Sequence, residues 1–224
     1  MHFKVNAIIP AGGTSSRFGN KNKLMEKING KEVIKYTVDA FNFSNVDNII
    51  ICANVSIIKE LQEIFKNYSK VKIIEGGQTR QASVFNGLKT DACDYVLIHD
   101  GARPMISVDI INSAIDLVKE KNALTVATKT IDTIKEVVDG KIVKTIDRSK
   151  LYNTQTPQAF KYELIKKAHE KLEGQNYTDD AGMLEDLGYD VFILNGSYKN
   201  IKITTQNDID IAKIYLNNFQ YQAV

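Results

Sequence analysis

Hydrophobic residues gather in short runs that recur along the chain, and most of these runs are apolar at every position. Six runs are rich in β-branched residues: 5–9, 49–52, 71–74, 95–98, 124–127 and 191–194. A strand buried on both faces has this pattern, whereas a strand with one wet face alternates polar and apolar positions. The runs therefore predict the buried strands of a mostly parallel sheet.

Helical patterns lie between these runs. Ser107 can cap a helix whose apolar residues at spacings of three and four share one face. Thr205 with Asp208 has the form of a capping box that opens a last helix. The inward face of that helix is Ile209, Ala212 and Leu216. Strands that alternate with helices predict an α/β fold whose sheet is covered on both sides.

One segment departs from the alternation. Residues 133–138 and 141–146 flank Asp139 and Gly140, the pair expected at a type I′ hairpin turn. An isolated two-stranded hairpin is marginal in water, so this one requires a surface to pack on. It either folds back on its own domain or forms an arm that docks on a second subunit, and the pattern alone favours neither.

The composition fits one globular domain over residues 1–224, with the hairpin at 130–150 protruding from it. Hydrophobic residues make up 43% and charged residues 25% of the chain. The formal charge of +2 argues against a nucleic-acid-coating protein or a polybasic membrane anchor. Cys52 and Cys93 fit reduced core residues. We find neither a signal peptide nor an apolar run long enough to span a bilayer, and expect a cytoplasmic protein without nucleic-acid or membrane partners.

A glycine-rich loop follows the first run: Pro10, Ala11, Gly12, Gly13, Thr14, Ser15, Ser16 and Arg17, with Lys23 shortly after. Ligands of an open parallel sheet bind beyond the carboxyl ends of its strands, where this loop lies. Its glycines let backbone N–H groups approach an oxyanion, and its cations suit a phosphate. It is neither a dinucleotide fingerprint nor a Walker A loop. The alternative is a plain turn with solvated cations, but the hydroxyl run and the spaced cations favour phosphate binding.

Polar clusters also follow later strands. Residues 75–83 place two glycines and an arginine before a helix, where a plain βα turn is the simpler interpretation. Asp100 follows a buried strand, where it either binds a metal or ribose or pairs with Arg103. His99 is interpreted as a core histidine, and residues 178–181 as a helix N-cap.

Eight motifs in order resemble the family of 2-C-methyl-D-erythritol 4-phosphate cytidylyltransferases, from about residue 5 to about residue 216. They are residues 10–13 with Arg17 and Lys23, 76–77 with Arg80 and Ser83, 99–104, 132–135, 147–148, 156–158, 178–181 and 200–204. The chain departs from the family pattern at Ser15, Leu24 and Gln78.

The resemblance implies a Rossmann-like nucleotidyltransferase fold, and a homodimer that exchanges the 130–150 arm. It also implies transfer of a cytidylyl group from CTP to methylerythritol phosphate with Mg²⁺. The implied CTP-binding residues are Ala11, Gly12, Gly13, Thr14, Gly77, Ser83, Asp100 and Gly101. The implied acceptor-binding residues are Arg103, Thr156 and Lys202, with Thr133 and Arg148 from the partner's arm. Arg17, Lys23 and Lys202 would be catalytic, and Asp100 would contact the metal, through water.

The residues themselves explain the lack of an evident general base. A phosphate monoester with a second pKa near ~6 is already ionised at neutral pH, so the difficulty is to bring two anions together. Other interpretations stay open: the same chemistry on ribitol 5-phosphate, a sugar-1-phosphate nucleotidyltransferase that shares the first loop, or a nucleotide-binding module without catalysis. The cations argue against the last, because mere binding has little need of them at the α-phosphorus.

Overall fold

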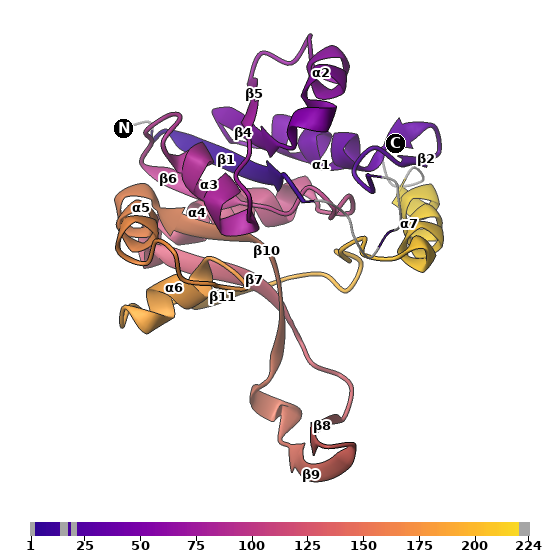
Figure 1. Cartoon of the computed structure of the whole chain (residues 1–224), viewed down its shortest axis with the longest axis vertical. Coiled ribbons are helices and arrows are strands. Elements are labelled where there is room, and N and C mark those ends of the chain that lie inside the picture. The colour runs from indigo at the N-terminus through magenta and orange to yellow at the C-terminus, as the bar shows by residue number, and fades with distance from the viewer. Residues whose placement is uncertain (1–2, 14–17, 19–21, 220–224) are drawn as a thin grey trace.

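A computed structural model of the chain describes residues 3–13, 18 and 22–219 (Figure 1). Within these residues one seven-stranded sheet has the order β11-β7-β10-β6-β1-β4-β5. The strands are β1 (Val5–Ala11), β4 (Asn48–Ala53), β5 (Val71–Glu75), β6 (Tyr95–Ile98), β7 (Ala123–Lys129), β10 (Tyr152–Lys161) and β11 (Phe192–Asn195). Each of the six apolar runs forms a strand, and only β10 runs antiparallel to its neighbours. The mostly parallel sheet is therefore confirmed.

Helices cover both faces of the sheet. One face packs on α1 (Val33–Asn42), α2 (Val55–Ile64), α4 (Val108–Lys121) and α7 (Gln206–Phe219). The other packs on α3 (Arg80–Leu88), α5 (Tyr162–Lys171) and α6 (Ala181–Asp186). Along β1, Ala7 and Ile9 enter the first core while Ile8 enters the second. Because each successive side chain is buried on one face or the other, the strand has no polar alternation.

The predicted helix starts are confirmed at both places. The Ser107 hydroxyl accepts a hydrogen bond from the Ile110 N–H at 3.3 Å where α4 begins. Before α7, Asp208 Oδ2 accepts from the Thr205 N–H at 2.7 Å. The predicted inward residues of α7 are buried. Across the described helices, none has the length and apolarity that a membrane crossing requires.

Strand β10 was not predicted, although it lies in the middle of the sheet. Its polar residues and Pro157 do not suggest a central strand, because proline cannot donate to the ladder. The pairing with β7 shifts register between Thr154 and Gln158, and the Thr156–Pro157 peptide bond is cis. The ladder is thus interrupted around the proline, which places Thr156 beside the end of β6.

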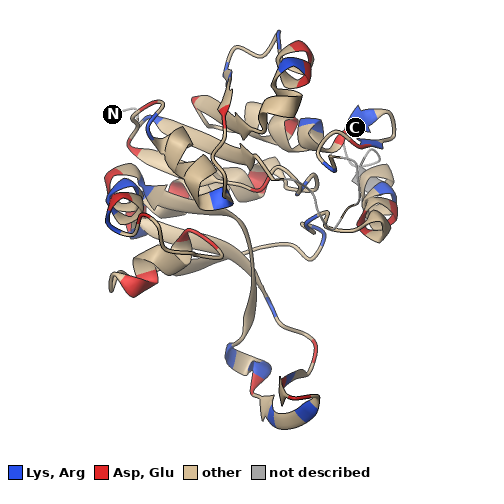
Figure 2. Ribbon diagram, in the orientation of Figure 1, with Lys and Arg blue, Asp and Glu red and all other residues tan. Residues whose placement is uncertain are grey.

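The hairpin is an arm that projects from the sheet (Figure 1). Strands β8 (Ile134–Val138) and β9 (Lys141–Ile146) pair antiparallel, and the turn residues Asp139 and Gly140 have φ of 48° and 76°, as a type I′ turn requires. Its apolar side chains are exposed: Val138 by 54% and Ile142 by 66%. Figure 2 shows lysines and acidic residues interspersed along the same ribbon. The arm therefore does not fold back on its own domain.

Candidate active site

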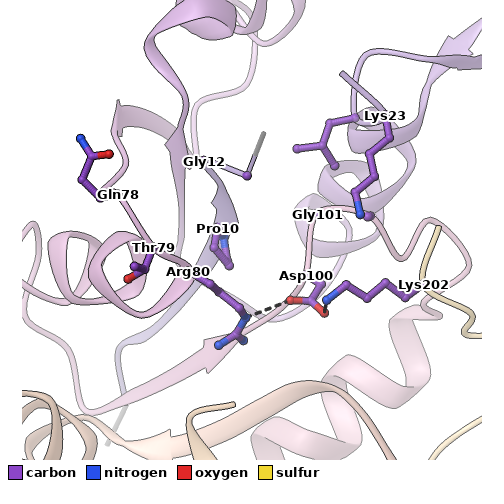
Figure 3. A pocket seen from close by; sticks show the side chains of 12 residues that line it. Pro10, Gly12, Lys23, Gln78, Thr79, Arg80, Asp100, Gly101 and Lys202 are labelled. Carbon is purple, nitrogen blue, oxygen red and sulfur yellow. Dashed lines mark hydrogen bonds and ion pairs between the residues drawn. The ribbon is translucent and has the colours of Figure 1, made fainter. Parts of the chain in front are cut away.

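A cavity of about 280 Å³ opens at the carboxyl ends of β1 and β6 (Figure 3). Five separate segments form its described walls. They are Pro10, Gly12 and Gly13; Lys23 and Leu24; Gln78, Thr79 and Arg80; Asp100, Gly101 and Ala102; and Lys202. The cavity lies where ligands of an open α/β sheet bind. Among the described residues, its lining carries three cations, Lys23, Arg80 and Lys202, and a single carboxylate, so it suits a polyanion.

The two lysines meet at this cavity from opposite ends of the sequence. Lys23 Nζ donates a hydrogen bond to the Ile203 carbonyl oxygen at 2.8 Å. Lys202 Nζ lies 2.8 Å from Asp100 Oδ2. The structure thus brings together two of the three cations that the resemblance assigns to the reacting phosphorus, while Arg17, like Thr14, lies outside the described residues.

Asp100 is the centre of an ion network. Arg80 Nε lies 3.2 Å from Oδ1, and Arg103 Nε lies 3.6 Å from Oδ2, the oxygen that Lys202 also contacts. Burial alone would raise the pKa of Asp100, but the three cations outweigh burial and hold it well below its usual range. Asp100 therefore stays ionised and keeps the cations close together before any phosphate arrives.

A second carboxylate supports Arg80 from behind. Arg80 Nη1 lies 2.7 Å from Asp180 Oδ2, and His169 Nε2 lies 3.1 Å from Asp180 Oδ1. The interpretation of residues 178–181 as an N-cap holds only for Asp179, which accepts from the Gly182 N–H at 3.1 Å. Asp180 instead fixes an arginine of the cavity. The sequence does not single out Arg80 as a site residue, because residues 75–83 also have the pattern of a plain βα turn.

Ser83 holds the loop that precedes α3. Its hydroxyl oxygen accepts from the Gly77 N–H at 3.0 Å and lies 2.9 Å from the Thr79 carbonyl oxygen. Ser83 is buried, at 1% exposure, and neither it nor Gly77 lines the cavity, although their neighbours Gln78 and Thr79 do. That the two residues face cytidine stays a prediction, and their visible role is to shape this wall.

We expect Gly77→Ala to destabilise the protein by about 1–3 kcal/mol and to weaken nucleotide binding, because an added Cβ overpacks the loop. It would lie 2.4 Å from the Ala82 Cβ and 2.8 Å from the Ala82 carbonyl carbon. Gly13→Ala is the matched control for stability, since no atom of the described residues lies within 4 Å of its added Cβ. Thermal denaturation and CTP titration measure both effects. Equal melting temperatures for the two variants would contradict the steric argument.

Behind Asp100 lies a buried polar layer. The Asp100 N–H donates to Thr156 Oγ1 at 3.1 Å, and Arg103 Nη1 donates to the Asn200 carbonyl oxygen at 2.8 Å. Within the described residues, Arg103 Nε and Asn200 Oδ1 are buried without a hydrogen bond, and the 3.6 Å ion pair with Asp100 Oδ2 is the contact of that Nε. A guanidinium N–H held only by a long ion pair keeps donor capacity for an anion.

Some of the remaining predicted residues line the cavity, and others do not. Ala11 ends β1 and is buried, while Gly12, Gly13 and Gly101 line the cavity. Thr133 and Arg148 belong to the arm, which projects away from the cavity of its own chain (Figure 1). The Arg148 guanidinium donates to the Ile131 carbonyl oxygen at the base of that arm. One chain therefore does not bring these two residues to its own cavity.

The donor set suits a metal that arrives on a nucleotide. Among the described residues no group of three or more His, Cys, Asp and Glu side chains is placed to hold a metal ion. Asp100 is the one carboxylate among the lining residues that the structure describes, and cations contact both of its oxygens. A hard cation such as Mg²⁺ often binds through one carboxylate and substrate phosphates. The residues fit that mode.

Solved structures with the same fold define the class of protein. The chain aligns with 4-diphosphocytidyl-2C-methyl-D-erythritol synthase from Anaerococcus prevotii at a TM-score of 0.86 and 33% identity, over 96% of each chain. It aligns with 2-C-methyl-D-erythritol 4-phosphate cytidylyltransferase from Thermus thermophilus at 0.82 and 26%, over 96% of this chain and 99% of the other. The fold and the polyanion cavity are those of a nucleotidyltransferase.

The sequence comparisons narrow the class to one family. The family model of 2-C-methyl-D-erythritol 4-phosphate cytidylyltransferase matches residues 5–218. The enzyme of that name from Clostridium acetobutylicum is 45% identical over 96% of this chain and 99% of its own. That from Clostridioides difficile is 42% identical over 95% and 93%. The chain belongs to the 2-C-methyl-D-erythritol 4-phosphate cytidylyltransferase family.

Proposed function

We propose that this enzyme transfers a cytidylyl group from CTP to 2-C-methyl-D-erythritol 4-phosphate, releasing the CDP-methylerythritol product and pyrophosphate. The reaction supplies isoprenoid precursors, and we place it in the cytoplasm. One observation carries the proposal: in a member of this family, Arg80, Arg103 and Lys202 surround the Asp100 carboxylate beside a glycine loop, and Lys23 lines the same cavity. Such a cavity neutralises several phosphates at once, as the reaction requires.

The chemistry follows from the charge of the acceptor. Its phosphate oxygen is ionised at neutral pH and attacks the α-phosphorus of CTP in line, while pyrophosphate leaves. The backbone N–H groups of Gly12 and Gly13 bind the triphosphate. Lys23, Lys202 and Arg17 stabilise the charge that gathers on the reacting phosphoryl group, and Arg103 holds the acceptor phosphate. Positioning of the two anions supplies much of the remaining acceleration.

Mg²⁺ is the proposed cofactor. Bound with the triphosphate, it would add positive charge to the phosphate oxygens and ease departure of pyrophosphate. Asp100 would hold it, directly or through water, because it is the carboxylate of the cavity lining. Arg80, Arg103 and Lys202, which contact Asp100, would then become available to phosphate oxygens.

We propose further that the enzyme is a homodimer in which each arm completes the partner's site. The support is physical: the arm exposes Val137, Val138, Ile142 and Val143, and an exposed apolar patch marks a contact surface. Thr133 and Arg148 would then reach the partner's cavity with a hydroxyl and a cation for the acceptor phosphate.

On this proposal, Arg148→Ala raises the acceptor KM by about tenfold or more and leaves the affinity for CTP unchanged, since it removes one charged contact to the acceptor alone. Lys150→Ala is the matched control, because it removes an exposed cation two residues away. Steady-state kinetics with varied acceptor, together with CTP titration, measure the difference. Collapse of CTP binding in Arg148→Ala would contradict the assignment.

Mixed subunits test whether the arm acts in the partner's site. In a heterodimer of Arg148→Ala and Lys23→Ala subunits, one site has both lesions and the other has neither. Mixing the two proteins should therefore restore activity at low acceptor concentration. If the arm serves its own chain, each site keeps one lesion and mixing restores nothing.

The substrate assignment is tested by incubating the enzyme with CTP, Mg²⁺ and one acceptor, and by measuring pyrophosphate. We expect release with methylerythritol phosphate, little with ribitol 5-phosphate, and little when UTP replaces CTP. Faster release with ribitol 5-phosphate would contradict the assignment of methylerythritol phosphate as the acceptor. No release with either acceptor would contradict the proposed cytidylyltransferase activity.

A further inference from the structure

The ring of His99 is buried behind the proposed acceptor site, at 0% exposure. It packs on Phe41 with ring centroids 5.0 Å apart. Nδ1 lies 3.0 Å from Thr156 Oγ1, and Nε2 lies 3.4 Å from the Arg103 carbonyl oxygen. His99 therefore lies between the two residues assigned to the acceptor phosphate, directly before Asp100 in the chain, and does not itself line the cavity.

The geometry determines which ring nitrogen carries the hydrogen. Burial lowers the pKa of His99 to about 3, so the ring is neutral at physiological pH and has one N–H. A carbonyl oxygen only accepts, so the hydrogen lies on Nε2, facing Arg103. With this assignment, the bare Nδ1 accepts the hydroxyl proton of Thr156.

This arrangement decides what the Thr156 hydroxyl can do. A hydroxyl has one proton, and here it is donated to His99. The oxygen accepts in turn from the Asp100 N–H at 3.1 Å. Thr156 thus has no proton left to donate to a phosphate oxygen. Its carbonyl oxygen accepts from Asn200 Nδ2 at 2.9 Å, which links the same layer to the segment that carries Lys202.

We propose that His99 is a positioning residue for the acceptor half of the site: it holds the Thr156 hydroxyl and the Arg103 backbone, and so sets where Asp100 and Arg103 present their charges. Thr156 acts within this chain of hydrogen bonds and not as a donor to the acceptor phosphate. The assignment of the acceptor half rests on the proposed function, whereas the hydrogen-bond directions do not.

A double-mutant cycle tests the proposal by kinetics. His99→Phe keeps a ring against Phe41 but removes both polar atoms, and Thr156→Val removes the hydroxyl at nearly constant shape. Each should raise the acceptor KM by about tenfold and leave the CTP dissociation constant within about twofold. The double variant should resemble either single one, because both break the same chain. If Thr156 donates directly to phosphate, the two effects multiply and the proposal fails.

Two further variants separate positioning from packing. His99→Asn places an amide oxygen where Nδ1 lies, so it should recover most of the acceptor KM. Phe41→Leu loosens the packing around the ring without removing a polar atom. It should lower the melting temperature and leave the acceptor KM unchanged. A rise in KM for Phe41→Leu as large as for His99→Phe would show that only packing matters, and would overturn the proposal.

Nitrogen NMR of histidine-labelled protein tests the hydrogen-bond directions without any turnover. The chain has 3 histidines, so loss of one pair of signals in His99→Phe assigns the ring. We expect a protonated Nε2, a bare Nδ1 whose shift moves in Thr156→Val, and no titration between pH 5 and 8. A protonated Nδ1 overturns the proposal. If Nε2 is protonated but the wild-type enzyme shows no turnover, the proposed function is refuted. The hydrogen-bond directions are then still supported.

Discussion

Lys23→Ala should lower kcat by about 10²–10³-fold, which corresponds to about 2.7–4 kcal/mol of lost transition-state stabilisation. Lys23 extends across the cavity until its ammonium group lies 2.8 Å from the Ile203 carbonyl oxygen, next to Lys202. The ammonium group is held there by contact between two segments that are distant in the sequence. In Lys23→Ala we therefore expect neither water nor another lysine to supply the missing charge. The CTP dissociation constant should change much less, because the loop and other cations still bind the triphosphate.

The measurement is pyrophosphate release at saturating CTP and acceptor, with CTP binding followed separately. Lys27→Ala is the matched control. It removes a lysine of the same neighbourhood whose side chain is 63% exposed and pairs only with Glu32 at 3.3 Å among the ion pairs of the described residues. Its kcat should equal that of the wild type. A Lys23→Ala enzyme with near wild-type kcat would remove Lys23 from the chemistry.

The strands and the cavity position could be predicted because both follow from local patterns. An apolar run reports burial on two faces, and a glycine loop after β1 lies at the ligand-binding edge whatever the rest of the chain does. The type I′ turn at Asp139 and Gly140 is equally local, since both residues must adopt positive φ. These features need no knowledge of distant partners.

Strand β10 and the Arg80–Asp180 pair could not be predicted because their causes are not local. β10 is held by neighbours on both sides, which outweighs its proline and polar residues. Asp180 has the sequence signature of an N-cap, and its pairing with Arg80 depends on contact between segments 100 residues apart. His99 was interpreted as a core residue, which its burial confirms, yet its partners Thr156 and Arg103 became visible only in three dimensions.

Asp100→Asn should lower the free energy of unfolding by about 3–5 kcal/mol at neutral pH, the cost of leaving buried charges without their partner. Arg80, Arg103 and Lys202 then repel one another around a neutral amide that replaces a carboxylate only 8% exposed. Asp116→Asn is the control, since its carboxylate is 76% exposed and pairs with Lys119 at the surface. Such surface pairs contribute about 0–1 kcal/mol.

The stability that Asp100→Asn loses should depend on pH in one direction. Because the folded-state pKa of Asp100 is lowered, the unfolded chain takes up the proton first as pH falls below ~3.9. The stabilisation is therefore fully present above that pH and is lost as pH falls through the folded pKa. Denaturant titrations should show a constant difference between wild type and Asp100→Asn from pH 5 to 8, which shrinks only in acid. A difference that grows in acid would mean that the carboxylate is protonated in the folded protein.

The same variant links stability to function. In the free enzyme Asp100 supplies the negative charge that the cation cluster requires, and in the proposed reaction the substrate phosphates supply it. Inorganic pyrophosphate should therefore raise the melting temperature of Asp100→Asn more than that of the wild type, because it restores a missing charge in one and competes with a carboxylate in the other. Equal shifts would mean that Asp100 and the phosphates do not share the same cations, and the mechanism would need a different route for Lys202 to reach the α-phosphorus.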